Sequence, residues 1–506
     1  MRATAQDHKW ITGCMIIIAG IACQCARDVV QEQGEILATI DDKTITVKDF
    51  QVRTELTVRP QYPALKNDEI NRLYLNNLIA EKLMALDGQK EKLLIDNPLF
   101  QAKMKGIQEQ NMREQLYNLK ISSCAPPNTN ELKQAYALAG REYNISFYTV
   151  QNDSFAGKIK NEFKKTPDLF ESIYYQFSSE KRIPKKVVKF NDPDPVVVNS
   201  SLFSKPLKVG QVIGPIKIES NQYIVIRVDN WKYYPAISTS EIQNRWINVN
   251  KKLKERKSFY AWKSYMTNLM AGKKINFEKD TFIKLSKIFF SMYDATDKSV
   301  RRETYGDFMT DDTRQIHFNN EMFEDILLDH PFLTIDNEEW TVRDFRDAFS
   351  LRPLVFEYRA VNLKDFQQQF REAIILMVSD HFLTKEAYKQ KLDKDPYVQH
   401  MRTMWEDAYV AMYHRDQIIK KIRERNNIDP KLIKEKSNYL SMYIDSLQQK
   451  YGSKISVNET ALDSIKLTDI NMYAMQPGMP YPVAVPGFPI LVQDGQFEYI
   501  RIKQNN

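Results

Sequence analysis

Histidine, the residue most often used for acid–base catalysis near neutral pH, is scarce in this sequence. Six occur among 506 residues: His8, His317, His330, His381, His400 and His414. The patterns that cradle a phosphate, present a nucleophilic serine, bind zinc through HExxH or pair two cysteines as CxxC are absent. Carboxylates and hydroxyls abound, but no spacing singles out a catalytic pair. We therefore expect no cofactor and no covalent catalytic step.

Three of the histidines, His381, His400 and His414, fall on helical patterns in the C-terminal half. A shared metal site is one interpretation, but packed or solvated helix positions are the ordinary one, so we predict no metal ion. The same half carries methionines and aromatic residues at helical spacing: Met401, Met404, Trp405, Met412 and Tyr413. Flexible methionines suit a groove that adapts to varied apolar partners, whereas a plain helical core is the alternative that we favour. The same choice applies to Phe259, Trp262 and Tyr265.

Length and composition limit the class of protein. A chain of 506 residues is too long for one ordinary core and predicts two to four domains. Aromatic residues make up 11%, which argues against disorder, and the scarcity of glycine favours helices over an all-β fold. The net charge of +7 is spread along the chain. Its densest basic runs, at 251–257 and 420–425, have helical patterns typical of solvated faces, so we predict no nucleic-acid partner.

The N-terminus has the pattern of an export signal. An apolar run of about 13 residues, WITGCMIIIAGIA at 10–22, follows a short segment with Arg2 and Lys9. The run is too short to span a bilayer comfortably. It ends in small residues directly before Cys23, a pattern similar to the bacterial lipoprotein box. We predict cleavage after residue 22, lipidation of Cys23 and an extracytoplasmic mature chain; secretion without a lipid is the alternative.

A segment near the N-terminus recurs in the second half of the chain. TIDDKTITVKDF at 39–50 and TIDNEEWTVRDF at 334–345 share seven of twelve residues. Each reads as a strand, a polar turn, a second strand and the start of a helix. An amphipathic helix follows in each copy. Two further pairs match in the same order: Arg59-Pro60 with Arg352-Pro353, and Asn97-Pro98 with Asp395-Pro396. These matches predict an internal duplication.

A second pair of segments supports the duplication. Residues 259–285 resemble residues 439–467, since each combines an aromatic-containing helix, a glycine-containing turn and a short strand. The first copy holds an extra stretch of about 110 residues between its two parts, and the second holds almost none. The first copy is therefore predicted to carry an inserted domain. The stretch IKLSKIFFSMY at 283–293 is expected to be a strand of the connector between the copies.

With these parts in this order, the chain resembles the SurA/PrsA/PpiD-type periplasmic chaperones. ILATIDDKTITVKDF, followed by LYLNNLIAEKLMALDGQKEKLLIDNPLFQAKM, is similar to the N-terminal module of that family. The family packs this module with a C-terminal helix and inserts a parvulin-type prolyl isomerase domain between them. The resemblance covers roughly 35–285, with the module repeated at 330–467. It implies a SurA-like chaperone of protein folding with a peptidyl-prolyl isomerase-like part.

Residues 123–232 occupy the position of the parvulin domain, and four motifs resemble that domain in order: Glu131, Leu132 and Tyr136, then 156–180, 202–216 and 221–228. Family parvulins combine an apolar proline pocket with a polar cluster that includes two histidines. Phe203 matches an apolar pocket residue, and Ser146 and Tyr223 lie near the positions of the two histidines. The resemblance makes Phe203 and Tyr223 the expected substrate-binding residues, and Ser146 and Tyr223 the catalytic candidates. Because 123–232 contains no histidine, it implies a degenerate domain that holds extended segments but isomerises them poorly.

The predicted fold class is α+β and mostly helical. Two chaperone lobes resemble the N-terminal module of SurA, and a parvulin-like α/β domain is inserted in the first. The predicted boundaries are a signal peptide at 1–22, a tether at 23–34, the first lobe at 35–122 and 233–286, the parvulin-like domain at 123–232, a connector at 287–329, the second lobe at 330–475 and a proline-rich tail at 476–506.

The function that the resemblance implies is that of a periplasmic chaperone, lipid-anchored to the outer membrane. It would bind unfolded exported or outer-membrane proteins without ATP, and contact the membrane through its N-terminal lipid. Two alternatives stay open. One is an active peptidyl-prolyl cis-trans isomerase with an altered site. The other is a fixed lipoprotein subunit of an outer-membrane insertion or secretion assembly, placed by its lipid and its proline-rich tail.

Overall fold

The computed structural model describes residues 34–60, 67–151, 153–165, 169–178, 182–219, 222–293, 328–351, 354, 362–426, 433–468, 480–481 and 483–491. This part of the chain is mostly helical with three small antiparallel sheets, in agreement with the predicted α+β class. Contacts divide the chain into a larger unit (1–116, 273–475 and 481–506) and a smaller unit (117–272 and 476–480). The predicted signal peptide, Cys23 and residues 294–327 of the connector lie outside the described residues.

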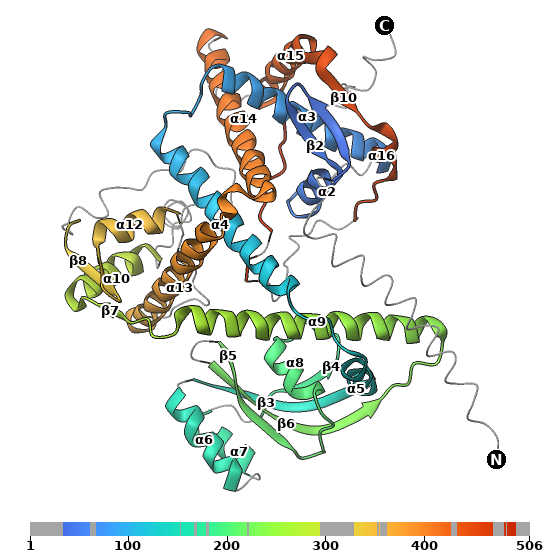
Figure 1. Ribbon diagram of the computed structural model, residues 1–506, viewed down its shortest axis with the longest axis vertical. Helices are drawn as coiled ribbons and strands as arrows, with labels where there is room; N and C mark the ends of the chain where they lie inside the picture. The colour runs from blue at the N-terminus through green and yellow to red at the C-terminus, as the bar shows by residue number, and fades with distance from the viewer. Residues whose placement is uncertain are drawn as a thin grey trace. The chain divides into compact units, whose positions relative to one another are not determined.

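The first copy of the repeat forms a β-hairpin that leads into a capped helix (Figure 1). β1 (Ile36–Ile40) pairs with β2 (Lys43–Thr46), and Asp41 takes a left-handed conformation (φ 55°) in the turn between them. Thr46 and Asp49 cap α2 (Val47–Glu55) reciprocally, because each side chain accepts a hydrogen bond from the backbone N–H of the other. α3 (Asn67–Lys90) then packs over this hairpin.

The second copy repeats this local structure. β8 (Pro331–Ile335) pairs with β9 (Glu338–Thr341), and Asp336 has the left-handed conformation in the turn (φ 56°). Thr341 and Asp344 exchange the same two capping hydrogen bonds at the start of α12 (Val342–Leu351). α13 (Leu363–Lys389) takes the place of α3. The hairpins agree because the residues that specify the turn and the cap are the ones that the repeats share.

Each hairpin is completed by a strand that lies outside its own repeat segment. β10 (Ile455–Val457) pairs with β1, so the strand order of the first sheet is β10-β1-β2. β7 (Ile275–Phe277) pairs with β8, and the order is β7-β8-β9. The neighbouring helices follow their strands into the two cores: α15 (Ile433–Tyr451) and α16 (Glu459–Ser464) into the first, with the turn η5 (Gly452–Lys454) between them, and α10 (Lys279–Tyr293) into the second.

This pairing differs from the grouping drawn from the sequence, which placed 233–286 with the first lobe and 439–467 with the second. The two completing segments resemble each other, so the local pattern does not decide which hairpin each one joins. Relative to that grouping, the two completing segments are exchanged between the copies. Residues 283–293 belong to α10, so the expectation of a strand there is wrong: Leu285 and Phe289, four residues apart, are both fully buried on one helix face.

Two long helices connect the copies to each other. α4 (Pro98–Ser122) and α14 (Pro396–Asn426) each begin with proline, which suits the first turn of a helix, and η4 (Leu392–Lys394) precedes α14. α14 packs closely on α3 at Gly88, where a Cβ would lie 2.8 Å from Cγ1 of Val410. α4 and α14 share a small core of their own: Phe100, Met104, Ile107, Trp405, Tyr409 and Val410.

The methionine and aromatic positions of α14 lie mainly in cores. Met401, Met404 and Trp405 are only 3–4% exposed, in agreement with the core interpretation. The proline-rich tail is docked where the structure describes it, since Val485, Phe488 and Leu491 are buried against the larger unit. None of the helices in the described ranges is both long enough and apolar enough to cross a membrane.

The smaller unit is built on a four-stranded antiparallel sheet in the order β4-β3-β6-β5. Its strands are β3 (Arg141–Gln151), β4 (Lys185–Lys189), β5 (Val212–Glu219) and β6 (Gln222–Tyr233). α5 (Thr129–Ala139), α8 (Val196–Phe203) and α9 (Thr239–Met270) cover one face, and α6 (Asp153–Lys165) and α7 (Phe170–Phe177) cover the other (Figure 1). Neighbouring side chains of a strand therefore enter two different cores.

Disulfide trapping tests the exchange of strands. Thr39 lies opposite Ser456, and Thr334 lies opposite Asn276. Cysteines at either pair should cross-link on mild oxidation, because facing Cα atoms of antiparallel strands lie about 4.5–5.5 Å apart. Mass spectrometry of the digested chain identifies the linked peptides.

The matched control combines Thr39→Cys with Asn276→Cys, the pair that an unexchanged first lobe would bring together. This control should stay reduced. Efficient cross-linking of the control pair, with none between positions 39 and 456, would contradict the exchange.

Candidate functional site

Phe203, the expected pocket residue, lies in the core of the smaller unit. It ends α8, is 0% exposed and packs against Tyr143 and Phe190, whose ring centroids are 5.2 and 5.3 Å away. An aromatic ring in this position stabilises the packing of α8 on the sheet. In this conformation its surface is not accessible to a substrate.

Ser146 and Tyr223, the two catalytic candidates, lie on neighbouring strands but are not brought together. Ser146 on β3 faces Arg227, whereas Tyr223 on β6 faces Val150. Four residues of β3 separate these positions, or about 13 Å along a strand. Tyr223 packs at the edge of the core beneath α6 and α7, with the ammonium of Lys217 5.6 Å from its ring centroid.

Ser146 belongs to a polar cluster that the sequence analysis did not identify. Its hydroxyl donates to Oδ2 of Asp229 over 2.5 Å, and Nε of Arg227 donates to Oδ1 of the same carboxylate over 2.9 Å. Arg227 also donates to Glu171 of α7 over 2.8 Å. Burial alone lowers the pKa of Arg227, but its bonds to Glu171 and Asp229 outweigh burial and raise that pKa.

This cluster lacks the parts of a nucleophilic site. A serine nucleophile needs a neighbouring base that accepts its proton near neutral pH. The group bonded to Ser146 is the carboxylate of Asp229, which is a weak base and is paired with Arg227. The segment 117–272 contains no histidine. The contacts therefore orient and neutralise charges, and we assign them no catalytic step.

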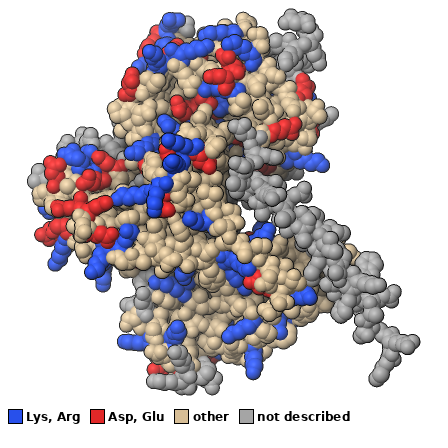
Figure 2. Space-filling model, in the orientation of Figure 1, with Lys and Arg blue, Asp and Glu red and all other residues tan. Residues whose placement is uncertain are grey.

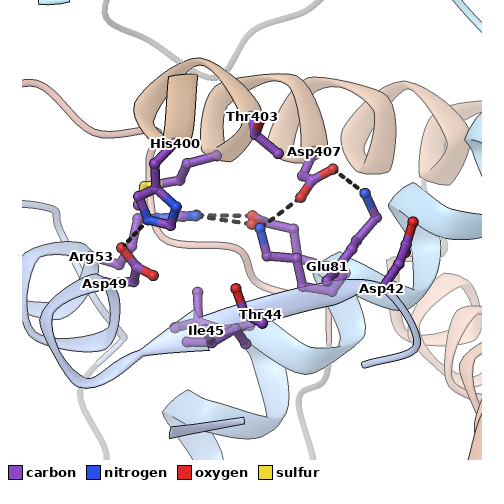
Figure 3. Close-up of a pocket in the computed structure, with 13 residues that line it drawn as sticks. Asp42, Thr44, Ile45, Asp49, Arg53, Glu81, His400, Thr403 and Asp407 are labelled. Atoms are coloured by element: carbon purple, nitrogen blue, oxygen red, sulfur yellow. Dashed lines mark hydrogen bonds and ion pairs between the residues drawn. The ribbon is translucent and has the colours of Figure 1, made fainter. Parts of the chain in front are cut away.

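The larger unit holds a small polar pocket of about 200 Å³ at the first hairpin, lined by β2, α2, α3 and α14 (Figure 3). Lys43 of β2 and Lys82 of α3 both donate to the carboxylate of Asp407 on α14, over 2.6 and 2.7 Å. The three side chains are 1–10% exposed. Burial alone raises the pKa of Asp407, but the two lysines outweigh burial and lower it. We call Lys43, Lys82 and Asp407 the lysine–aspartate lock.

The other charged groups labelled in this pocket are largely paired as well. Arg53 donates twice to Glu81, over 2.9 and 2.8 Å, and Nε2 of His400 lies 2.7 Å from Oδ1 of Asp49. Figure 3 shows these pairs beside the lock, between α14 and the hairpin. Charged side chains that already pair with one another bind a charged ligand only weakly. The pocket therefore serves to hold α14 against the first copy.

A second buried cluster contains His414. Its Nε2 lies 3.2 Å from Oδ2 of Asp87, Tyr443 donates to the same oxygen, and Lys450 donates to Oδ1 over 2.9 Å. These bonds, that of His414 foremost, hold the pKa of Asp87 well below its usual range. Asp87, Glu91 and His414 could offer metal ligands within 4.8 Å of one another. The ammonium of Lys450 already supplies positive charge there, so the geometry suits an ion pair.

The three histidines considered for a metal do not meet. His381 packs edge-on against Trp340, His400 bonds Asp49, and His414 bonds Asp87. His381 thus packs on the second copy, whereas His400 and His414 contact carboxylates of the first. A shared metal site of the three is therefore not formed.

The second hairpin carries an open groove of about 610 Å³. Four of its lining residues are apolar or aromatic: Trp340, Ala348, Leu351 and Tyr388. The lining has five carboxylates and two lysines, which give it a formal charge of −3. They are Glu109, Glu338, Glu339, Asp344, Asp347, Lys105 and Lys385. Figure 2 shows acidic side chains gathered on the lobe of α12 and α13, at the left of the view. The rest of the lining is His381 and Thr384.

The groove is the counterpart of the pocket at the first hairpin. The repeat aligns Glu338 with Lys43. Aligning the helix-starting prolines of α4 and α14 places Glu109 at the position of Asp407. The groove thus keeps the central carboxylate but has an acid where the lock has its first lysine.

The remaining lysine of the lock is also replaced. Aligning the buried pairs Leu78-Ile79 of α3 and Met377-Val378 of α13 places His381 at the position of Lys82. The same alignment places Tyr388 at Gln89. This match is supported by geometry, since Tyr388 donates to Glu109 over 3.3 Å as Gln89 donates to Asp407 over 3.4 Å. The replacement of Lys43 by Glu338 was visible in the repeated twelve residues, whereas the match of His381 with Lys82 and the contact of α4 with the second copy required the structure.

Comparison with known proteins adds little. No protein-family model matches the chain, and no curated protein matches it. The crystal structure of peptidylprolyl isomerase (PrsA) from Bacillus cereus is similar over 49% of this chain and 96% of its own, with 16% identity and a TM-score of 0.18. At that identity and TM-score the likeness is weak, and we draw no conclusion about fold or function from it.

Removing the acid of the lock should destabilise the larger unit. Asp407→Ala leaves two lysines buried without their carboxylate, which costs about 3–5 kcal/mol. Replacing all three members (K43M/K82M/D407M) should restore most of that loss, because no buried charge remains. Urea unfolding followed by fluorescence measures both variants.

Asp445→Ala, at an exposed position, is the control and should change stability by less than about 0.5 kcal/mol. If Asp407→Ala lowers the free energy of unfolding by less than about 1 kcal/mol, the lock does not stabilise the larger unit.

Glu114 of α4 is a buried carboxyl that accepts a hydrogen bond from the hydroxyl of Tyr397 over 2.8 Å. Burial raises its pKa to about 7, despite the opposing effect of that hydrogen bond. The folded chain therefore holds this proton in a range of pH, from about 4.5 to 7, where the unfolded chain has released it. Stability should fall as pH rises through that range.

Glu114→Gln should remove this pH dependence, since the amide carries no charge and still accepts from Tyr397. At pH 8 the variant should be more stable than the parent by on the order of 3 kcal/mol, and near pH 4 the two should agree. Urea unfolding at a series of pH values provides the comparison. Parallel curves for parent and variant between pH 5 and pH 8 would mean that Glu114 is ionised in the folded chain.

Proposed function

We propose that the protein is a polypeptide-binding chaperone of the bacterial cell envelope that works without ATP and without a covalent step. The groove at the second hairpin is the observation that carries this proposal. Its volume of about 610 Å³ and its mixture of aromatic floor and polar rim suit one or two side chains of an extended segment. Weak, exchanging contacts of this kind are what a holding chaperone needs.

The order of parts in the sequence supports the same proposal. The hairpin module, the inserted sheet domain and the repeat resemble SurA-type chaperones in their order, and residues 10–23 resemble a lipoprotein export signal. We propose that the mature chain is lipidated at Cys23 and faces the periplasm. Its clients would then be unfolded exported or outer-membrane proteins.

We propose further that the smaller unit does not isomerise prolyl bonds. An isomerase must bind the twisted amide better than the planar one, which requires polar groups placed around an open pocket. Here Phe203 is buried, Ser146 is bonded to a carboxylate, and Tyr223 lies about 13 Å from Ser146 along the strand. The unit would serve as a scaffold or a further binding surface.

Suppression of aggregation by the purified chain tests the proposal. An outer-membrane protein diluted from urea should scatter less light when the chain is present at equal concentration, and ATP should change nothing. Tyr388→Ala in the groove should weaken the protection several-fold. Tyr260→Ala is the control, since Tyr260 is similarly exposed (45% against 40%) and lies in the smaller unit.

Two results would replace this proposal by one of the alternatives. Acceleration of Xaa-Pro isomerisation above buffer, lost in Tyr223→Ala, would identify an active isomerase; Phe203→Ala is unsuitable here because truncating a buried ring costs about 3–5 kcal/mol. Failure to protect any unfolded client, together with stoichiometric purification with a single envelope protein, would identify a fixed subunit of an assembly.

A further inference from the structure

We propose that the groove selects segments in which lysine or arginine stands beside apolar residues, and that the basic side chain takes the place that the two lysines of the lock fill in the first copy. The groove lining is defined by the residues given above. This inference rests on the proposed function, because it names the class of segment that the same groove accepts.

The first copy shows how this fold neutralises the central carboxylate. Asp407, 1% exposed, is bonded by two ammonium groups that reach it from the hairpin and from α3. The corresponding positions around Glu109, which is 3% exposed, are Glu338 and His381. Both of the chain's own cations are therefore gone from these positions, and one acid has been added. A basic side chain of a ligand would return a cation to a position that the first copy fills with its own lysines.

The charge of the rim favours the same ligand. The groove lining has a formal charge of −3, although the whole chain has a net charge of +7, so the groove is acidic in a basic protein. Lys385 bonds Glu338 over 2.8 Å, but their side chains are 49% and 56% exposed, and such surface pairs are worth little and exchange readily. Complementary charge of this kind attracts a basic segment and repels an acidic one.

The apolar part of the groove completes the match. Trp340 and Leu351 belong to the hairpin and α12, and Tyr388 of α13 is 40% exposed. Aromatic faces attract ammonium and guanidinium groups as well as apolar side chains. A segment with one apolar anchor and a basic neighbour therefore uses both parts of the groove, whereas a purely apolar segment uses one.

Three peptides of equal length test the selectivity. Each carries a central Leu-Trp pair flanked by four identical residues, which are lysine, serine or glutamate. Their affinities for the full chain are measured by fluorescence anisotropy at low salt. The lysine peptide should bind at least about tenfold more tightly than the glutamate peptide, and its advantage should shrink at high salt, where charges are screened beyond about 3 Å.

A variant that rebuilds the lock in the second copy tests the location. E338K/H381K places two lysines where the first copy has Lys43 and Lys82 and should weaken the lysine peptide at least about tenfold. E339K/D347K, confined to exposed acids of the lining, is the second variant in case the first does not fold, and it should weaken the peptide in the same direction. D96K/D445K changes two exposed acids outside the groove lining by the same charge and should leave affinity within about twofold.

The outcomes separate this inference from the proposed function. Equal binding of all three peptides, weakened in each case by Tyr388→Ala, would overturn the selectivity and leave a polypeptide-binding groove. Unchanged affinity of the lysine peptide in both groove variants would overturn the location. Failure of every peptide to bind would overturn the inference and the proposed function together.

Discussion

The carboxylate of Asp407 is bonded by two lysines that lie 364 and 325 residues away from it in the sequence. A buried carboxylate is costly unless its charge and its hydrogen-bond acceptors are satisfied, and Lys43, Lys82 and Gln89 do both. The bonds reach Asp407 from the hairpin and from α3, so they join three elements at one point. The close approach of α3 and α14 at Gly88 lies in the same interface. The position of α14 on the first copy depends on this group of contacts.

The same contacts hold the two halves of the chain together. α14 and β10 follow the second hairpin in the sequence but complete the first copy, while β7 and α10 lie between the two hairpins in the sequence and complete the second. Each hairpin is therefore incomplete without a segment that the sequence comparison grouped with the other copy. Both copies keep the hairpin and the helix that follows it. Each hairpin therefore carries a site at the corresponding place. Their charges have diverged: the first is closed by the lysine–aspartate lock, and the second is an open acidic groove.

Local features could be predicted from the sequence because they depend on neighbouring residues. The hairpins, their polar turns and the capping pairs Thr46–Asp49 and Thr341–Asp344 follow from the repeated twelve residues. The choice of completing strand could not be predicted, since INF at 275–277 and ISV at 455–457 carry the same local pattern. Phe203 shows a related limit. Its apolar character predicts burial, but not whether it lines a pocket or fills a core. The groove itself needed both the repeat alignment, which shows Lys43 replaced by Glu338, and the structure, which brings Glu109 beside it.

The stoichiometry of peptide binding tests most directly the claim that one of two equivalent sites is closed by its own lysines and the other is open to a ligand. Isothermal titration of the full chain with the lysine-flanked peptide measures the number of sites. The account predicts one peptide per chain, bound at the second hairpin. Two equivalent peptides per chain, or one that is displaced by changes at Lys43 and Lys82 rather than at Glu338 and His381, would contradict it.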